Sequence, residues 1–415
     1  NHPFEISLHG GEDTPLLEAS TLWRARATQD GATLLVHQRS SNSEIDLDVR
    51  PSIDGGGSYG ASEDPDFGCG GIVQTSLTVM QPDGRQHLIG GVPGSVLPVD
   101  AAMSPDGSWV AIANAGMADS ETPQREVFRA DDHGEAEPFF GDFPPRVGPS
   151  SSSAAPKASV TLVHTRSLEA VLTQPDAQPE LPFHNCAPPE HLGGLPDTPA
   201  TAVAFAPQPT SSRNGLFSRS VLVVQTREPA MILVSNGTDS PVGIDLGGDS
   251  RLDTGHELFH RDVGAGLACA SCHAEGGEDG RAWQFKGLGP RRTQSLDVGL
   301  ADMAPFHWDG TLPDVNALLE DVMVTRMGGA HQDVQRVGAL ERWLFALPRP
   351  RPMVPSESQA AQRGALLFAS SALRCMSCHG ASGTPSRENF DVGTGEDLQV
   401  PSLRGIGYRA PFMHD

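Results

Sequence analysis

Short apolar runs, separated by clusters of Gly, Pro, Asn and Asp, fill the first part of the chain. Three stretches share one plan: an apolar strand, a turn, a second strand rich in Val, Ile and Leu, and a polar stretch. They are Ala25 to Asp48, Ala101 to Gly116 and Ala202 to Leu246. The Asp-Gly turns at Gly31 and Gly107 lie 76 residues apart, close to two repeats of about 40 residues. This pattern predicts an all-β region over 1–246, a β-propeller of about five or six blades, with a β-sandwich as the alternative.

The periodicity becomes helical from Arg251 onwards. Apolar positions at helical spacing follow Asp253, a residue type that caps helix N-termini. A second amphipathic pattern covers 334–347 and ends at a proline, and the plan restarts at Ser358. The sequence therefore predicts two mainly α domains of cytochrome c type, the second of them incomplete, joined by a stiff Pro-rich linker. We place their bounds at 247–348, 349–356 for the linker, and 357–415.

Each helical domain carries one Cys-x-x-Cys-His motif, Cys269-Ala-Ser-Cys272-His273 in the first and Cys375-Met-Ser-Cys378-His379 in the second. In this motif the thiols add to the vinyl groups of a haem and the histidine ligates its iron. A zinc site built from both cysteine pairs is the alternative, but the pairs lie 103 residues apart rather than about 15 to 20. The motifs predict two covalently bound c-type haems, with His273 and His379 as iron ligands.

The formal net charge of −23 over 415 residues disfavours nucleic acid and anionic membranes as partners and favours an electron-transfer protein with a basic surface. No apolar run approaches the length of a membrane span. Haem attachment of this kind takes place outside the bacterial cytoplasm, so we expect a periplasmic or extracellular protein. The remaining cysteines, Cys69 and Cys186, are predicted either to form a disulfide there or to be two separate buried thiols. The oligomeric state stays open.

The chain from 251 to 415 resembles the bacterial di-haem cytochrome c peroxidase family, which includes the MauG-type enzymes. Besides the haem motifs, the resemblance is carried by Gly255, Leu258-Phe259, Arg292 to Leu296, Pro305 to Gly310, Val400 to Arg404 and Ala410 to Asp415. It implies that the haem at His273 meets peroxide and the haem at His379 receives electrons, with Trp308 between them. The N-terminal region resembles the YVTN-type or YncE-like propellers of bacterial surface and periplasmic proteins.

Two departures from the family bear on its chemistry. The resemblance implies a catalytic glutamate for O–O cleavage where this chain has Arg326. An arginine can stabilise a leaving anion but cannot transfer a proton at neutral pH. Glu320 or Asp321 could take over the acid. The family's calcium ion uses an Asn at the position of Arg292, so we expect no calcium even though backbone carbonyls near Arg409 remain.

The sixth ligands of both irons are predicted less directly. The family's distal His on the first haem has no obvious counterpart; His307 is the first candidate and Met327 the second. The other interpretation of His307 is a hydrogen bond to a haem propionate or to the backbone. The resemblance implies an axial Met for the second haem beyond Asp415, so we expect the native chain to continue, with Met413 as a weaker candidate.

Three functions stay open at this point. The first is an oxidoreductase that reduces peroxide, or oxidises a partner, at the first haem with electron relay through the second. The second is a non-catalytic electron-transfer cytochrome, with the propeller as a docking platform. The third is a surface-assembly protein that carries haem as a conduit. Trp308 and Arg326 are the candidate catalytic residues of the first function.

Overall fold

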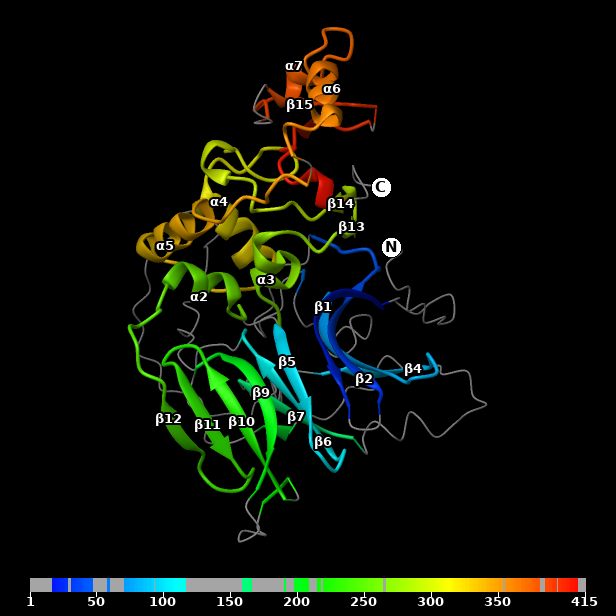
Figure 1. Ribbon diagram of the computed structural model, residues 1–415. Coiled ribbons are helices and arrows are strands. Elements are labelled where there is room, and N and C mark those ends of the chain that lie inside the picture. The colour runs from blue at the N-terminus through cyan, green and yellow to red at the C-terminus, as the bar shows by residue number, and fades with distance from the viewer. Residues whose placement is uncertain are drawn as a thin grey trace, which may run out of the picture.

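In a computed structural model the chain forms a β region, a first helical region and a second helical region, which follow one another from bottom to top in Figure 1. The β region covers 17–245, the first helical region 254–347 and the second helical region 359–409. The structure describes residues 17–28, 31–47, 58–59, 71–92, 94–116, 159–165, 190–191, 198–208, 215–217, 219–263, 266–353, 355–380, 385–393 and 395–409. Cys69, Cys186 and Met413 lie outside these ranges, and the predictions made for them stay predictions.

The β region contains three antiparallel sheets whose strands pair in sequence order. The first sheet consists of β1 (Leu17–Ala27), β2 (Thr33–Ser41), β3 (Val73–Met80) and β4 (Gln86–Gly91). The second consists of β5 (Pro98–Met103), β6 (Trp109–Asn114), β7 (Val160–His164) and β8 (Glu190–His191). The third consists of β9 (Ala200–Pro207), β10 (Ser220–Thr226), β11 (Met231–Ser235) and β12 (Val242–Asp245). Gly31 and Gly107 have φ values of +84° and +70° in the turns predicted for them, a conformation that glycine adopts without steric cost.

Asp100 on β5 links the three sheets. Its buried carboxylate pairs with Arg24 at 3.1 Å and Arg26 at 3.0 Å, both on β1, and accepts a hydrogen bond from the backbone N–H of Val203 on β9 at 3.1 Å. Charge-assisted contacts of this kind fix the relative placement of the sheets. A four-stranded meander is the unit of a propeller blade, but within the described ranges the sheets do not close a ring. The propeller therefore stays a prediction.

The first helical region is made of short helices, helical turns and one β-hairpin. They are α2 (Thr254–His260), α3 (Cys269–Cys272), η2 (Ala274–Gly276), β13 (Ala282–Phe285), β14 (Gly289–Arg292), η3 (Leu300–Asp302), α4 (Val315–Leu318), η4 (Leu319–Arg326) and α5 (Val334–Phe345). Asp253 caps α2 as predicted, accepting from the backbone of His256 at 3.0 Å. The face of α5 predicted to be apolar is buried at Val337, Leu340 and Leu344.

The β region and the first helical region share one hydrophobic core. Ile45 and Leu97 from the β region are buried in the same cluster as Phe259 and Phe285. The contact is also a backbone pairing, because Ile45 N–H donates to the Gln284 carbonyl at 2.8 Å. The apolar surface of the first helical region is thus covered in part by the β region, which ties the two together.

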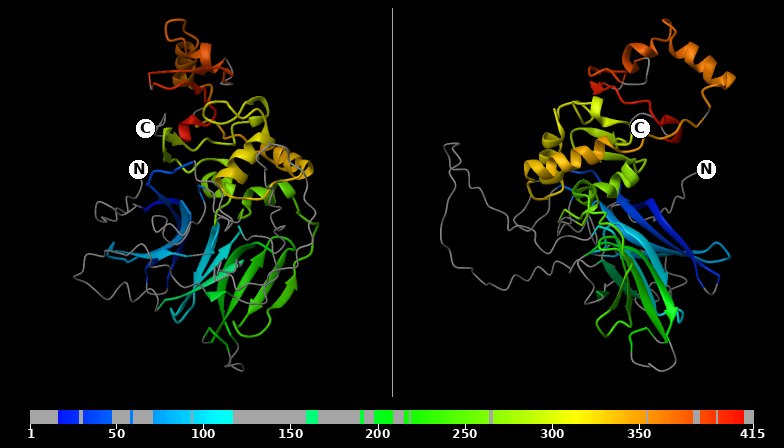
Figure 2. Two further views of the ribbon diagram at one scale, coloured as in Figure 1. Left: turned by 180° about the vertical axis from the view of Figure 1, so that it is seen from behind. Right: turned by 60° about the vertical axis from the view of Figure 1, so that its left-hand side comes forward.

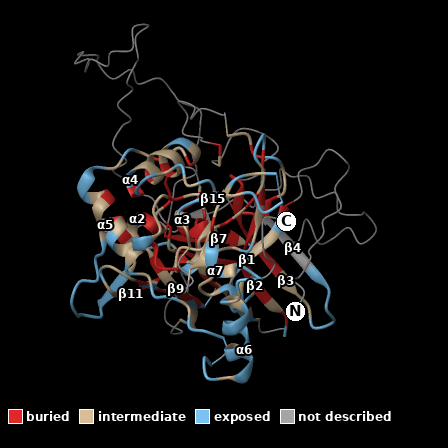
Figure 3. Ribbon diagram, turned by 90° about the horizontal axis from the view of Figure 1, so that it is seen from above, coloured by how far each residue is buried: buried red, intermediate tan, exposed pale blue. Residues whose placement is uncertain are grey.

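The second helical region extends away from the sheets (Figure 2) and is far less buried (Figure 3). It consists of α6 (Gln359–Phe368), α7 (Cys375–His379), β15 (Asn389–Phe390), β16 (Leu398–Gln399) and η5 (Ile406–Tyr408). The helical pattern restarts at Ser358 as predicted, and the structure shows this residue as the N-cap of α6, although α6 has no buried residue. Gln399 joins this region to the first, donating to the carbonyls of Trp308 at 2.8 Å and Pro305 at 2.6 Å. None of the described helices has the length and apolar composition of a bilayer span.

Candidate functional site

The first Cys-x-x-Cys-His motif forms α3 at the edge of the shared core. The N-terminus of this helix is fixed by Ser271, whose side chain accepts from the backbone N–H of Ala268 at 3.0 Å. Cys269 and Cys272 are both free thiols and pack against the core cluster. Burial raises the pKa of Cys269 to about 11 and that of Cys272 well above its ordinary value. Both sulfurs are therefore neutral thiols on a single helical turn.

His273 follows the helix and is oriented by the backbone. Its Nδ1 lies 3.3 Å from the Gly277 carbonyl, so we assign the Nδ1–H tautomer, with this nitrogen as the donor. Burial lowers the pKa of His273 to about 4, which leaves the imidazole neutral at ordinary pH. A neutral imidazole that donates through Nδ1 keeps the lone pair of Nε2 free for a metal.

The second motif repeats this arrangement in a more open setting. Cys375 and Cys378 on α7 are free thiols, and His379 Nδ1 lies 3.2 Å from the Pro401 carbonyl. Pro401 belongs to the Val400 to Arg404 block on which the family resemblance partly rests. Apolar side chains around this motif face solvent, among them Leu366, which is 75 % exposed.

Both motifs fit a covalently attached haem. Each presents two free thiols and one histidine whose Nε2 is available, which is the donor set that such a group needs. The four cysteines lie in two separate regions (Figure 1), whereas a zinc site requires its ligands around one ion. Over the described ranges, no group of three or more His, Cys, Asp and Glu side chains could hold a metal ion.

A small cavity of about 110 Å³ lies near the first motif. No residue of the motif lines it, but His307 in its wall is close enough to His273 for the two imidazoles to interact electrostatically. His307, Trp308, Asp321 and Arg326 line the cavity, together with Leu288, Arg291, Asp309, Thr311 and Leu312. The His307 ring packs against that of Trp308 at an interplanar angle of 50°, with 3.9 Å between the ring centroids, and its backbone has a φ of +80°. Burial, followed by the positive charge of Arg326, lowers the pKa of His307 to about 3. His307 is thus a neutral imidazole at the cavity wall.

Arg326 is placed by a π-type turn that the sequence pattern did not predict. In η4 the backbone bonds reach five residues back, as from Met327 N–H to the Val322 carbonyl at 2.9 Å. This spacing sets Asp321 beside Arg326, and their carboxylate and guanidinium are 2.6 Å apart. Such bulges often occur at functional sites. Burial alone would lower the pKa of Arg326, but Tyr59 and Asp321 raise it above its ordinary value.

Two candidates were predicted for the missing acid and two for the sixth ligand of the first iron, and in each pair only one lines the cavity. Asp321 lines the cavity, whereas the carboxylate of Glu320 pairs with His331 at 2.7 Å. Met327 is buried in the shared core, and His307 lines the cavity. Of each pair, Asp321 and His307 are therefore the members that share a space with Arg326.

Trp308 lies where the two helical regions meet. Its Nε1–H donates to the Arg292 carbonyl at 2.9 Å, and its own carbonyl accepts from Gln399. Its ring also contacts Phe285, at 5.2 Å between centroids. A role of Trp308 in electron transfer stays a prediction, and this position is compatible with it.

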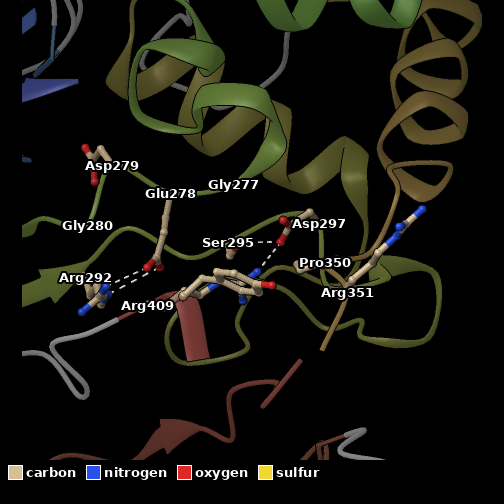
Figure 4. Close-up of a pocket in the computed structure, with 11 residues that line it drawn as sticks. Gly277, Glu278, Asp279, Gly280, Arg292, Ser295, Asp297, Pro350, Arg351 and Arg409 are labelled. Carbon is tan, nitrogen blue, oxygen red and sulfur yellow. Dashed lines mark hydrogen bonds and ion pairs between the residues drawn. The ribbon is translucent and has the colours of Figure 1, made fainter. Parts of the chain in front are cut away.

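A larger pocket of about 450 Å³ opens between the two helical regions and the linker (Figure 4). Of its three acidic side chains, Asp279 is buried, which raises its pKa to about 6, and its Oδ2 has no hydrogen-bond partner. The other two are paired with arginine: Glu278 with Arg292 at 2.7 Å, and Asp297 with Arg409. Figure 4 shows both guanidinium groups directed at these carboxylates. Two of the three carboxylates in this pocket are thus neutralised by arginine, and the prediction about calcium stays a prediction.

No family model, no curated protein and no solved structure matches this chain.

Proposed function

We propose that the chain is a di-haem c-type oxidoreductase of the kind that reduces peroxide or oxidises a partner at the first haem, with electrons relayed through the second. The observation that carries this proposal is the shared design of the two motifs. In each, Nδ1 of the histidine lies within hydrogen-bond distance of a carbonyl, of Gly277 or Pro401, and the histidine follows two free thiols. The haem would supply reversible one-electron chemistry and an iron site for a small ligand.

The surroundings of the two motifs favour different roles, chemistry at the first and electron exchange at the second. The first is buried and lies near the 110 Å³ cavity, a size that admits only a few water-sized molecules. Arg326 in its wall can stabilise developing negative charge, and neutral His307 can accept a hydrogen bond, although its pKa of about 3 makes it a poor proton acceptor at neutral pH. The second motif is open to solvent, as suits exchange of electrons with another protein.

The alternative is a non-catalytic electron carrier. It is favoured by Arg326 itself, because an arginine stands where the family's acid is expected and cannot protonate a leaving oxygen, while its ion pair engages the nearby Asp321. If neutral His307 ligates the first iron, the site is closed to peroxide as well. In both versions we propose a location outside the cytoplasm and a redox partner with a basic surface, for which the β region is the docking platform.

Haem counting tests the cofactor assignment. We expect a pyridine haemochrome assay to give two c-type haems per chain, and one after Cys269→Ser with Cys272→Ser or after Cys375→Ser with Cys378→Ser. The matched control is Met376→Ala, which changes a residue between the two thiols of α7 that is 38 % exposed and removes no thiol. A wild-type chain that carries no covalent haem would refute the proposal.

Spectroscopy separates the two functions. A catalytic first site is expected to be high-spin, or to become so on half reduction, and to consume hydrogen peroxide with an electron donor. In that case His307→Ala leaves the spin state unchanged. If the first haem stays low-spin and becomes high-spin only in His307→Ala, the electron carrier is the correct function.

A further inference from the structure

Tyr59, a residue of the β region that the sequence analysis did not single out, contacts Arg326 in the wall of the 110 Å³ cavity. Tyr59 packs against the shared core, and its ring centroid lies 6.0 Å from that of Phe285. Its backbone N–H donates to the Arg326 carbonyl at 2.8 Å, and its hydroxyl accepts from Arg326 Nη1 at 3.4 Å. One residue of the β region therefore contacts Arg326 at both its backbone and its guanidinium.

These contacts leave the guanidinium of Arg326 little freedom. Asp321 holds Nη2 at 2.6 Å, Tyr59 accepts from Nη1, and the central carbon lies 5.6 Å from the Trp308 ring centroid. The arginine side chain is only 11 % exposed. Arginine has several rotatable bonds, so a single fixed position requires partners on more than one side. Without the phenol, only Asp321 would hold the end of the side chain.

A fixed cation changes the chemistry of its surroundings. It stabilises whichever redox state carries one more electron, and the effect grows as the charge is held closer and in a less polar medium. Arg326 lies in the wall of the cavity that also contains His307. His307 is close enough to interact electrostatically with both Arg326 and His273 of the first motif, so the charge of Arg326 would also act on a redox centre held by that motif.

We propose that Tyr59 is a positioning residue for the first haem site: it fixes the Arg326 guanidinium against Trp308 and thereby raises the reduction potential of that haem. The inference rests on the proposed function, because it requires a haem at the first motif. It makes the β region part of the redox site as well as a docking surface.

The test is a redox titration of the full-length, haem-loaded protein and its variants, followed in the visible spectrum. We expect Arg326→Gln to shift one of the two reduction waves to lower potential and leave the other in place. Tyr59→Phe should shift the same wave in the same direction by a smaller amount. The double variant should match Arg326→Gln alone, because Tyr59 acts only through the guanidinium. Tyr408→Phe, the same change at the chain's other tyrosine, is the control and should shift neither wave.

Each contrary result has a definite meaning. If Arg326→Gln moves a wave and Tyr59→Phe does not, or if the two shifts add in the double variant, Tyr59 does not position the arginine. If neither variant moves a wave in a protein with two haems, the inference is wrong while the proposed function stands. A protein without covalent haem refutes the proposed function itself. Should Tyr59→Phe not fold, Arg326→Lys takes its place, because a lysine keeps the charge but cannot bridge Asp321 and Tyr59. We then expect the same wave to shift to lower potential, by less than in Arg326→Gln. An unshifted wave overturns the inference.

Discussion

The crossing of α2 and α5 offers a sharp test of the packing around the first motif. The two helices meet at Gly255, where an added Cβ would lie 2.4 Å from the Ala339 carbonyl oxygen and 2.5 Å from the Trp343 Cβ. The carbonyl belongs to helix backbone, so the clash is relieved only if the helices separate. Overpacking of this kind costs ~1–3 kcal/mol, while replacing a helical Gly by Ala gains about 1 kcal/mol. For Gly255→Ala we expect a net loss of about 1–2 kcal/mol, toward the upper half of the overpacking range because backbone atoms clash.

Hydrogen exchange measures this loss locally, which suits a chain of several regions better than a single melting temperature. A loss of 1–2 kcal/mol corresponds to roughly 5- to 30-fold faster exchange of the α2 and α5 amides. Gly364→Ala on α6 is the matched control, since an added Cβ there meets nothing within 4 Å. It should slow exchange in α6 and leave α2 and α5 unchanged. Unchanged or slower exchange of α2 in Gly255→Ala would show that the helices do not approach as closely as described.

Three further predictions concern ionisation. In the chain prepared without haem, iodoacetamide should modify the second motif before the first. The reason is that burial raises the pKa of Cys269 from 9.0 to about 11, which lowers the fraction of this residue present as thiolate about 100-fold. Equal labelling rates of the two motifs by mass spectrometry would contradict this. In Tyr408→Phe the remaining phenol, Tyr59, should titrate near pH 12 in the ultraviolet with the far-UV circular dichroism intact, because burial raises its pKa to about 12; a transition near 10 in the folded protein argues against its burial. Burial lowers the pKa of His37 from 6.5 to about 4. Between these two values the unfolded chain binds a proton that the folded chain does not, so the contribution of His37 to the free energy of unfolding is complete above pH 6.5 and is lost as the pH falls to 4. Over that window His37→Gln should reduce the slope of unfolding free energy by about 1.4 kcal/mol per pH unit, and denaturant titrations with an unchanged slope would refute it.

Local sequence was sufficient for the elements that depend on nearest neighbours. Asp253 and Ser358 were predicted as helix starts and are the N-caps of α2 and α6. Gly31 and Gly107 were predicted as turns and have the positive φ that those turns need. Both are short-range effects, in which one side chain satisfies a backbone group or one missing Cβ allows a conformation.

The sequence by itself also determined the chemistry at the two motifs, because the spacing of thiols and imidazole is fixed within five consecutive residues. What only the tertiary structure decided is which groups surround them. Tyr59 lies more than 260 positions before Arg326, and no local pattern connects the two. The choice of Asp321 over Glu320 depends on a π-type turn, which shifts by one residue the side chains that share a helix face. Long-range packing and helix register therefore set the environment of a site whose donor atoms the sequence had already specified.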